Sequence, residues 1–354
     1  MKNQTMFSKL KVKEIRKETN DTVSIAFEIP NDLRSEFSYK SGQYITVKSD
    51  VSGEDIRRAY SLCSSPYDDD FRIGVKKVES GKMSTFLNED LKEGAELEVM
   101  APAGNFVIRE GNKNIVAFAA GSGITPILSM VKSILKIGGN FTLFYGNKSS
   151  SETIFKTELD SLKNEFSDKF NLHYIYSREE FGNKLYEGRI DTDKTTLLMK
   201  ENLNLLKSDG FYMCGPEDMI LNVSTALKEL GVGENKIHFE LFTAPTIKND
   251  NAEVVASDFL GESQVTVIMD GDEFEFPLKS DGDFILDVAI ENGADAPFSC
   301  KGAVCCTCKA QVIEGKAIME MNYSLSDEEV ADGFILTCQA HPASEKLVVD
   351  YDVT

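Results

Sequence analysis

The stretch Cys300-Lys-Gly-Ala-Val-Cys305-Cys306-Thr-Cys308 decides how the rest of this sequence is interpreted, together with Cys338 in Leu336-Thr-Cys-Gln-Ala-His341. Cys300, Cys305, Cys308 and Cys338 follow the pattern C-x4-C-x2-C, a gap, then C, a spacing typical of a [2Fe–2S] cluster. Two irons need four thiolate sulfurs that converge on one small volume, so a tight loop supplies three sulfurs and the fourth comes from elsewhere. The sequence therefore predicts a metal centre held by these four cysteines.

The residues between the proposed ligands fit such a loop. Gly302 and the small Ala303 let the backbone fold over inorganic sulfides, whose charge backbone N–H groups stabilise. Cys306 lies between two proposed ligands, and we expect it to point away as a buried structural thiol. A structural zinc site is the alternative. Such sites usually pair two C-x2-C units or add histidines at short spacing, and here His341 is a lone neighbour.

Length and charge restrict the classes of function. The 354 residues imply two or three domains. The net charge of −20 makes nucleic acid and anionic membranes poor partners. From Ser263 to the C-terminus there are 18 acidic residues and 5 basic ones. This acidic region either steers the protein towards a basic docking face on a redox partner or serves solubility alone.

The sequence also bears on the compartment. The N-terminal residues contain no apolar signal-peptide core, and no apolar run reaches 18 residues. Seven cysteines, four of them assigned to a cluster, suit a reducing compartment rather than a disulfide framework. We therefore expect a cytoplasmic protein.

The first hundred residues are typical of a small antiparallel barrel. Alternating apolar and polar residues, separated by Gly, Pro and Asp/Asn clusters, predict six strands at 9–15, 23–29, 44–48, 57–63, 72–78 and 96–100. In Arg57-Arg58-Ala-Tyr60-Ser61, Tyr60 offers a flat face for an aromatic ring system and Ser61 offers a hydroxyl for a ring nitrogen. Arg58 supplies positive charge for a phosphate.

A second stretch of the barrel adds an anion site. Glu79-Ser-Gly81-Lys82-Met83-Ser84 opens an expected short helix, whose free N–H groups suit a pyrophosphate. For either stretch alone, ordinary packing is the competing interpretation.

After residue 108 the pattern changes to alternating strands and helices. The apolar strand Ile115-Val-Ala-Phe-Ala-Ala120 is followed by Gly121-Ser-Gly123-Ile-Thr125-Pro126 and a helical run. This arrangement of strand, glycine turn and helix predicts a dinucleotide loop at the end of a parallel sheet. The loop departs from G-x-G-x-x-G because Pro126 takes the last position. Further βα units follow, with helices expected at 153–166 and 217–230, and a closing strand at 237–242.

Two strand ends in this region carry candidate ligands. Ser177 and Arg178 follow the strand expected at 171–176, and no acidic residue that would prefer a bare 2′-hydroxyl ends that strand. The family resemblance given below implies that these two residues hold the 2′-phosphate, Ser177 by a hydrogen bond and Arg178 by charge, which favours NADPH over NADH. Arg178 as a solvated surface charge is the alternative. Cys214-Gly215-Pro216 ends the strand beginning at Gly210, and Cys214 is not needed for the cluster, which favours a site role over a buried thiol.

The remaining chain predicts a linker at 243–262 and a last α+β domain. A hairpin with the turn Asp270-Gly271, a short helix at 285–290, the cysteine loop and a late strand at 346–351 follow in order. Ser326-Asp-Glu-Glu329 has the spacing of a helix capping box.

Taken in order, these motifs resemble the ferredoxin–NADP⁺ reductase family with a C-terminal plant-type ferredoxin of β-grasp fold. The resemblance rests on R-x-Y-S at Arg58, G-x-x-S/T at Gly81, G-x-G-x-x-P at Gly121 and C-G-P at Cys214. It implies a multidomain chain: an antiparallel FAD barrel at 1–108, an NAD(P) α/β domain at 109–242, a linker at 243–262 and a [2Fe–2S] domain at 263–354. One family turn usually has proline where this chain has Ser41, which predicts a slightly looser turn.

The resemblance also implies roles for individual residues, which are as follows. Arg58, Tyr60 and Ser61 hold the flavin, and Lys82, Met83 and Ser84 surround its phosphates. Gly121, Gly123, Thr125 and Pro126 form the dinucleotide loop. Cys214, Gly215 and Pro216 lie beside the nicotinamide. Glu240 and Phe242 lie near the flavin edge, where Phe242 covers the ring, with core packing as the alternative for both.

This domain order looks like that of the reductase components of bacterial oxygenases. It implies that hydride passes from NADPH (or NADH) to FAD beside Tyr60 and Ser61, with Cys214 and Glu240 nearby. Electrons then leave singly through the cluster to an oxygenase component. Cys-Lys-Gly-Ala-Val-Cys and Phe-Tyr-Gly-Asn-Lys-Ser-Ser resemble the subfamily that serves phenylacetyl-CoA epoxidase. The alternatives are a reductase for a ring-hydroxylating dioxygenase, steroid hydroxylase or desaturase, and a non-catalytic zinc-bearing adaptor.

Overall fold

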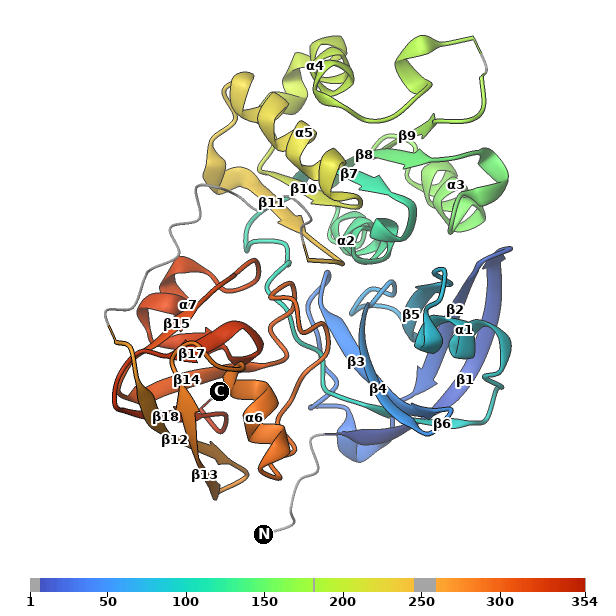
Figure 1. Ribbon diagram of the computed structural model, residues 1–354. Coiled ribbons are helices and arrows are strands. Elements are labelled where there is room, and N and C mark those ends of the chain that lie inside the picture. Colours follow the sequence, from blue (N-terminus) through green and yellow to red (C-terminus); the bar gives the residue numbers. More distant parts are fainter. Residues whose placement is uncertain (1–6, 181, 245–258, 354) are drawn as a thin grey trace.

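The computed structural model describes residues 7–180, 182–244 and 259–353. Three main sheets form, each from one consecutive part of the chain (Figure 1). Residues 245–258, most of the predicted linker, lie outside the described residues. Within the described part, no helix is long and apolar enough to cross a membrane.

The first sheet is six-stranded and antiparallel. Its part of the chain contains β1 (Ser8–Thr19), β2 (Thr22–Glu28), β3 (Tyr44–Val51), β4 (Glu54–Ser61), β5 (Phe71–Lys76), α1 (Lys82–Glu89) and β6 (Glu96–Val99). The strand order is β4-β3-β6-β1-β2-β5. A bridge between Leu62, just after β4, and Ile73 of β5 brings the two edges together, so the sheet curls into the predicted barrel.

The second sheet is parallel. Its strands are β7 (Asn114–Ala120), β8 (Asn140–Asn147), β9 (Phe170–Tyr176), β10 (Gly210–Cys214) and β11 (Ile237–Glu240), in the order β11-β10-β7-β8-β9. Its helices are α2 (Ile124–Lys136), α3 (Lys156–Glu165), α4 (Thr192–Glu201) and α5 (Glu217–Glu229). The sequence patterns did not predict α4, although Asp191 caps it by accepting a hydrogen bond from the Lys194 N–H.

Helix α3 begins later than predicted, at Lys156 rather than Thr153. The cause is Phe155, which has a φ of 57° and is almost completely buried. A left-handed backbone at this position cannot continue a helix. The buried ring instead anchors the turn before α3 in the core shared with α2.

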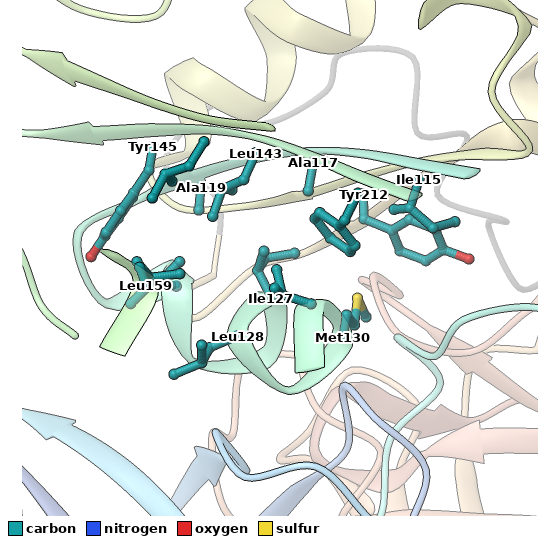
Figure 2. Packing of buried hydrophobic residues seen from close by; sticks show 14 of the residues in the cluster. Ile115, Ala117, Ala119, Ile127, Leu128, Met130, Leu143, Tyr145, Leu159 and Tyr212 are labelled. Atoms are coloured by element: carbon teal, nitrogen blue, oxygen red, sulfur yellow. The ribbon is translucent and has the colours of Figure 1, made fainter. Parts of the chain in front are cut away.

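Helix α2 lies between the parallel sheet and the barrel (Figure 1). Figure 2 shows Ile127 and Met130 directed towards sheet residues such as Ala117 and Tyr212, in one continuous apolar core. Helix α2 is buried on nearly all sides, and the face that does not pack on the sheet contacts the barrel. There Ser129 Oγ donates a hydrogen bond to the Ser64 carbonyl at 2.6 Å. The helix therefore joins the two domains.

The turn at Ser41, for which the sequence predicts a slightly looser conformation, is tied to α2. Ser41 is buried, and its hydroxyl bonds the Ser133 hydroxyl of α2 at 2.5 Å, while Ser65 bonds the same hydroxyl at 2.8 Å. A proline at this position would lack the hydroxyl. Serine thus replaces backbone stiffness with a contact between domains.

The third sheet belongs to the last part of the chain. The elements there are β12 (Glu262–Met269), β13 (Asp272–Lys279), α6 (Ile285–Glu291), β14 (Lys309–Glu314), β15 (Ala317–Met319), α7 (Asp327–Ala331), β16 (Phe334–Leu336), β17 (Ala340–Pro342) and β18 (Lys346–Asp350). The order is β13-β12-β18-β14-β16, in which β12 and β18 are parallel and the other pairs antiparallel. Strands β15 and β17 form a separate pair. The predicted capping box of Ser326 and Glu329 is present at the start of α7.

Candidate functional site

The four predicted cysteines come together as two pairs. Cys305 Sγ lies 3.1 Å from Cys300 Sγ within the loop. Cys338 forms the second pair with Cys308. The preceding residue, Thr337, holds Cys338 there, because its N–H and its hydroxyl both donate hydrogen bonds to the Cys308 carbonyl. Strand β14 begins directly after Cys308, and the short turn after β16 carries Cys338. The pairing β14–β16 therefore brings the distant fourth cysteine to the loop.

Two thiol pairs fit two irons better than one ion. Each iron of a [2Fe–2S] cluster takes two protein sulfurs, whereas a structural zinc gathers four ligands around one point. Among the described residues no group of three or more His, Cys, Asp or Glu side chains is arranged to hold a single metal ion. Hydrogen bonds from the Cys305 thiol and from backbone N–H groups, including that of Gly302, lower the pKa of Cys300 to about 6. The loop thus favours the thiolate, which is the ligand form, at Cys300, whereas the hydrogen bond with Cys300 raises the pKa of Cys305.

The backbone of the cysteine loop turns tightly between Cys300 and Cys305. Lys301 and Ala303 both have positive φ, at 50° and 60°. Cys306 points away from the pairs, as predicted, and bonds the Ser324 carbonyl at 3.4 Å. It is half-buried rather than fully buried, because it lies where the loop faces Asn105 of the barrel.

The predicted flavin residues lie at the end of β4. Tyr60 is half-buried, and burial raises the pKa of its hydroxyl, which keeps it neutral. Arg58 is exposed, and its guanidinium donates to the Arg57 carbonyl at 2.7 Å. Antiparallel pairing places Ser61 opposite Tyr44 of β3. An open cation, an aromatic face and a hydroxyl thus follow one another along one strand, an arrangement that fits a flavin and its phosphates.

Ser61 and Glu240 meet across the junction of the barrel and the parallel sheet. The Ser61 hydroxyl donates to Glu240 Oε2 at 3.4 Å. Glu240 ends β11 and pairs in register with Cys214, the last residue of β10. The fold therefore brings together three of the four predicted catalytic residues, and the fourth, Tyr60, is adjacent to Ser61.

The Glu240 carboxyl has an unusual proton affinity. Burial raises its pKa to about 8, although the hydrogen bond from Ser61 opposes this shift. Because the folded state binds this proton more tightly than the unfolded chain, the resulting stabilisation is complete below about pH 4.5 and is lost as pH rises through 8.

Replacing Glu240 by Gln tests this assignment. Glu240→Gln removes the titration while keeping the shape of the side chain. We therefore expect the difference in thermal midpoint, variant minus wild type, to increase as pH rises from 6 to 9. The measurement is differential scanning fluorimetry of both flavin-loaded proteins across that range. Parallel curves would show that Glu240 is ionised throughout.

The start of α1 matches the predicted phosphate loop in position. Ser84 is buried, and its hydroxyl accepts from the Val78 N–H at 3.2 Å and donates to the Gly81 carbonyl at 3.1 Å, which folds the loop onto the helix. Met83 is buried in the barrel core. Lys82 is exposed and pairs with Glu54 at 2.5 Å, so its ammonium is shared with the β3–β4 hairpin.

In the parallel-sheet domain, a cleft of about 760 Å³ lies beside the carboxyl ends of the strands. Six of the predicted residues line it: Gly121, Ser177, Arg178, Gly215, Pro216 and Phe242. Phe242 is 42% exposed, as suits a ring that covers a flat ligand. In this fold a dinucleotide is expected to bind outside the carboxyl ends of the strands, at the point where the strand order reverses.

Other predicted residues lie beneath the cleft rather than in its wall. Gly123 is buried, and a Cβ there would meet the Cys214 carbonyl oxygen at 2.1 Å, so only glycine allows α2 to start so close to β10. Thr125 and Pro126 are buried in the first turn of α2. The Cys214 thiol is fully buried in the core, where burial raises its pKa well above the usual value.

Beside Arg178, the cleft contains three cations that sequence reasoning missed, namely Lys76, Lys148 and Arg189. Lys148 directly follows β8, and the rule that ligands bind at strand ends would have found it. Arg189 lies in an irregular segment, and no local pattern marks it. A bridge between Glu187 and Tyr176 brings this segment to the end of β9. Within the described residues, neither Arg178 nor Arg189 forms an ion pair.

Comparison with known protein families assigns each of the three sheets. Residues 9–108 match the oxidoreductase FAD-binding domain, 118–225 the oxidoreductase NAD-binding domain, and 267–343 the 2Fe-2S iron-sulfur cluster binding domain. The fold and the site thus define an oxidoreductase that uses FAD, NAD(P)H and a [2Fe–2S] cluster for electron transfer.

Within that class, the chain belongs to the family of oxygenase reductase components. It is 39% identical to a subunit of 1,2-phenylacetyl-CoA epoxidase of Escherichia coli K12, over 98% of both chains. It is 32% identical to the ferredoxin reductase component of 3-ketosteroid-9-alpha-monooxygenase of Rhodococcus rhodochrous, over 97% of this chain and 96% of that one. The structure of phthalate dioxygenase reductase matches with a TM-score of 0.62 at 26% identity, over 97% of this chain and 98% of that one. The predicted family is confirmed, and the match to the 2Fe-2S domain favours the cluster over the zinc-bearing adaptor.

Proposed function

We propose that this reductase passes electrons from NADPH to the oxygenase component of a phenylacetyl-CoA epoxidase, in the cytoplasm. The observation that carries the proposal is the 39% identity, over 98% of both chains, with a subunit of that enzyme. The reducing compartment is supported by the seven cysteines, none of which forms a disulfide. The sequence-based domain limits of 1–108, 109–242, 243–262 and 263–354 are part of the proposal.

The choice of NADPH rests on the charge of the cleft. Four cations line it, Lys76, Lys148, Arg178 and Arg189, and they outnumber the three carboxylates Glu152, Asp191 and Asp218. The Lys148 ammonium lies 3.4 Å from Glu152 and is half exposed, so it stays available to an anion. A 2′-phosphate gains charge-assisted hydrogen bonds from such groups, whereas a 2′-hydroxyl gains much less.

The residues of the chain have distinct tasks in this function. When bound, FAD supplies the ability to accept a hydride and release electrons singly, and the cluster accepts one electron at a time. Tyr60 and Phe242 provide apolar faces, and Ser61 provides a hydroxyl at the junction of the two domains. Glu240, whose pKa is about 8, holds a proton at its carboxyl at neutral pH. Arg58 and the first turn of α1 provide positive charge and N–H groups for phosphates.

Reconstitution with purified oxygenases tests the acceptor. We expect NADPH consumption by this reductase to depend on phenylacetyl-CoA when the oxygenase subunits of phenylacetyl-CoA epoxidase are present, because each turnover draws electrons only when substrate is bound. The control replaces those subunits with a 3-ketosteroid monooxygenase, the second candidate acceptor, favoured by the 32% identity to its reductase. Coupling to the ketosteroid enzyme alone would contradict the proposal.

A further inference from the structure

The loop that carries the cluster cysteines is held against the flavin barrel at two places. On one side Arg57 of β4 reaches Asp295 and Ala296, a few residues before Cys300. On the other side Tyr44 of β3 reaches the segment between Cys305 and Cys308. Arg57 lies on β4, the strand that carries the candidate flavin residues, and Tyr44 lies on β3, which pairs with β4.

Arg57 is a buried cation at the domain boundary. Its side chain is 5% exposed, and Nη2 lies 2.6 Å from Asp295 Oδ1, while Nη1 donates to the Ala296 carbonyl at 3.3 Å. The guanidinium lies 4.6 Å from the centre of the Phe298 ring, two residues before Cys300, which is cation–π distance. An ion pair, a hydrogen bond and a cation–π contact thus fix this side chain against the start of the cluster loop, and Asp55 of its own strand lies 3.3 Å away.

Stability alone is a poor explanation for this charge. Arg57 loses its water on burial, whereas its partners Asp295 and Asp55 stay 65% and 49% exposed, so these carboxylates offset only part of the desolvation cost of the guanidinium. The Arg57 Nε is also buried without a hydrogen-bond partner in the described part of the chain, which adds to the desolvation cost. A charge retained at such a cost, beside a loop built for an anionic cluster, suits a role in positioning that cluster and in setting its electrostatic environment.

Tyr44 links the two redox sites through a single pair of residues. Its hydroxyl accepts from the Cys306 N–H and lies 3.1 Å from Thr307 Oγ1. In the ladder of β3 and β4, Tyr44 is directly opposite Ser61, whose hydroxyl faces Glu240 at the candidate flavin site. Paired residues in antiparallel strands lie about 5 Å apart at their Cα atoms. One ladder step therefore connects the candidate flavin site with the cluster loop.

We propose that Arg57 and Tyr44 are positioning residues that hold the cluster loop on the flavin barrel for direct electron transfer between the two cofactors. The proposal rests on the electron route from NADPH through FAD to the cluster. In addition, the Arg57 charge raises the reduction potential of the cluster, because the reduced cluster carries one more negative charge than the oxidised one.

The test compares Arg57→Met, Arg57→Lys and Tyr44→Phe in the holoprotein by stopped-flow absorbance and by redox titration of the cluster. We expect flavin reduction by NADPH to be unchanged and flavin-to-cluster electron transfer to be about tenfold slower in Arg57→Met and Tyr44→Phe, since a shift of about 1 Å can cost up to ~100-fold. The cluster potential becomes more negative in Arg57→Met, and Arg57→Lys restores it.

Lys48→Met is the matched control. Lys48 is paired with Arg57 in the same ladder, and its replacement by Met removes the same positive charge. Lys48 contacts Asp55 and Glu98 of the barrel rather than the cluster domain. Iron, sulfide and flavin contents verify that each variant is loaded. If Arg57→Met and Tyr44→Phe both match Lys48→Met in rate and potential, the positioning role is refuted. If NADPH fails to reduce the wild-type cluster, the electron route itself is wrong.

Discussion

Cys305→Ser lowers the reduction of cytochrome c to the level that the flavin alone supports. Reduction of the flavin by NADPH stays intact. Cys305 lies 3.1 Å from Cys300 in one thiol pair, so its loss removes one of the two sulfurs available to one iron. The flavin and nicotinamide residues lie on other domains and keep their contacts. The measurements are iron and acid-labile sulfide content, cytochrome c reduction with NADPH as donor, and the stopped-flow rate of flavin bleaching.

The neighbouring cysteine supplies the control for this result. Cys306 is adjacent in sequence but bonds the Ser324 carbonyl, and a serine hydroxyl at this position keeps that bond. Cys306→Ser therefore retains iron, sulfide and cytochrome c reduction. Cys305→Ala covers the case in which a serine oxygen still binds iron. Full cytochrome c reduction by Cys305→Ala would show that electrons leave the protein without passing through the cluster.

Arg178→Ala raises the KM for NADPH by roughly 10- to 100-fold and changes the KM for NADH little. A hydrogen bond to a charged group is worth about 1.5–3 kcal/mol, and each 1.4 kcal/mol corresponds to about a factor of ten. Arg178 lines the cleft and forms no ion pair within the described residues, so the side chain is free to bind a 2′-phosphate. The measurement is steady-state kinetics with both nucleotides.

Two further variants make the test specific. Arg189→Ala shows whether the second guanidinium of the cleft shares the phosphate. Lys136→Ala removes an exposed cation at the far end of α2 and leaves both KM values unchanged. Equal effects of Arg178→Ala on NADPH and NADH would mean that the guanidinium acts on a part common to both nucleotides, and the phosphate role would be withdrawn.

The sequence itself determined the three folds and indicated most of the candidate site residues. The alternation of apolar residues predicted the barrel strands and the parallel strands, because both patterns reflect burial on one or two faces. Cys300, Cys305, Cys308 and Cys338 were recognisable because ligand spacing is a local property of the chain. Gly123 was recognisable because a close backbone approach permits no Cβ.

Only the tertiary structure decided how these parts meet. Three features join residues that no spacing rule connects. Ser61 bonds Glu240, Arg189 lines the cleft, and Tyr44 and Arg57 contact the cluster loop. Ser41 shows the same limit, since its partner Ser133 lies on another domain. Sequence periodicity records which face of an element is buried, whereas the packing of domains depends on side chains that become neighbours only after each sheet has formed.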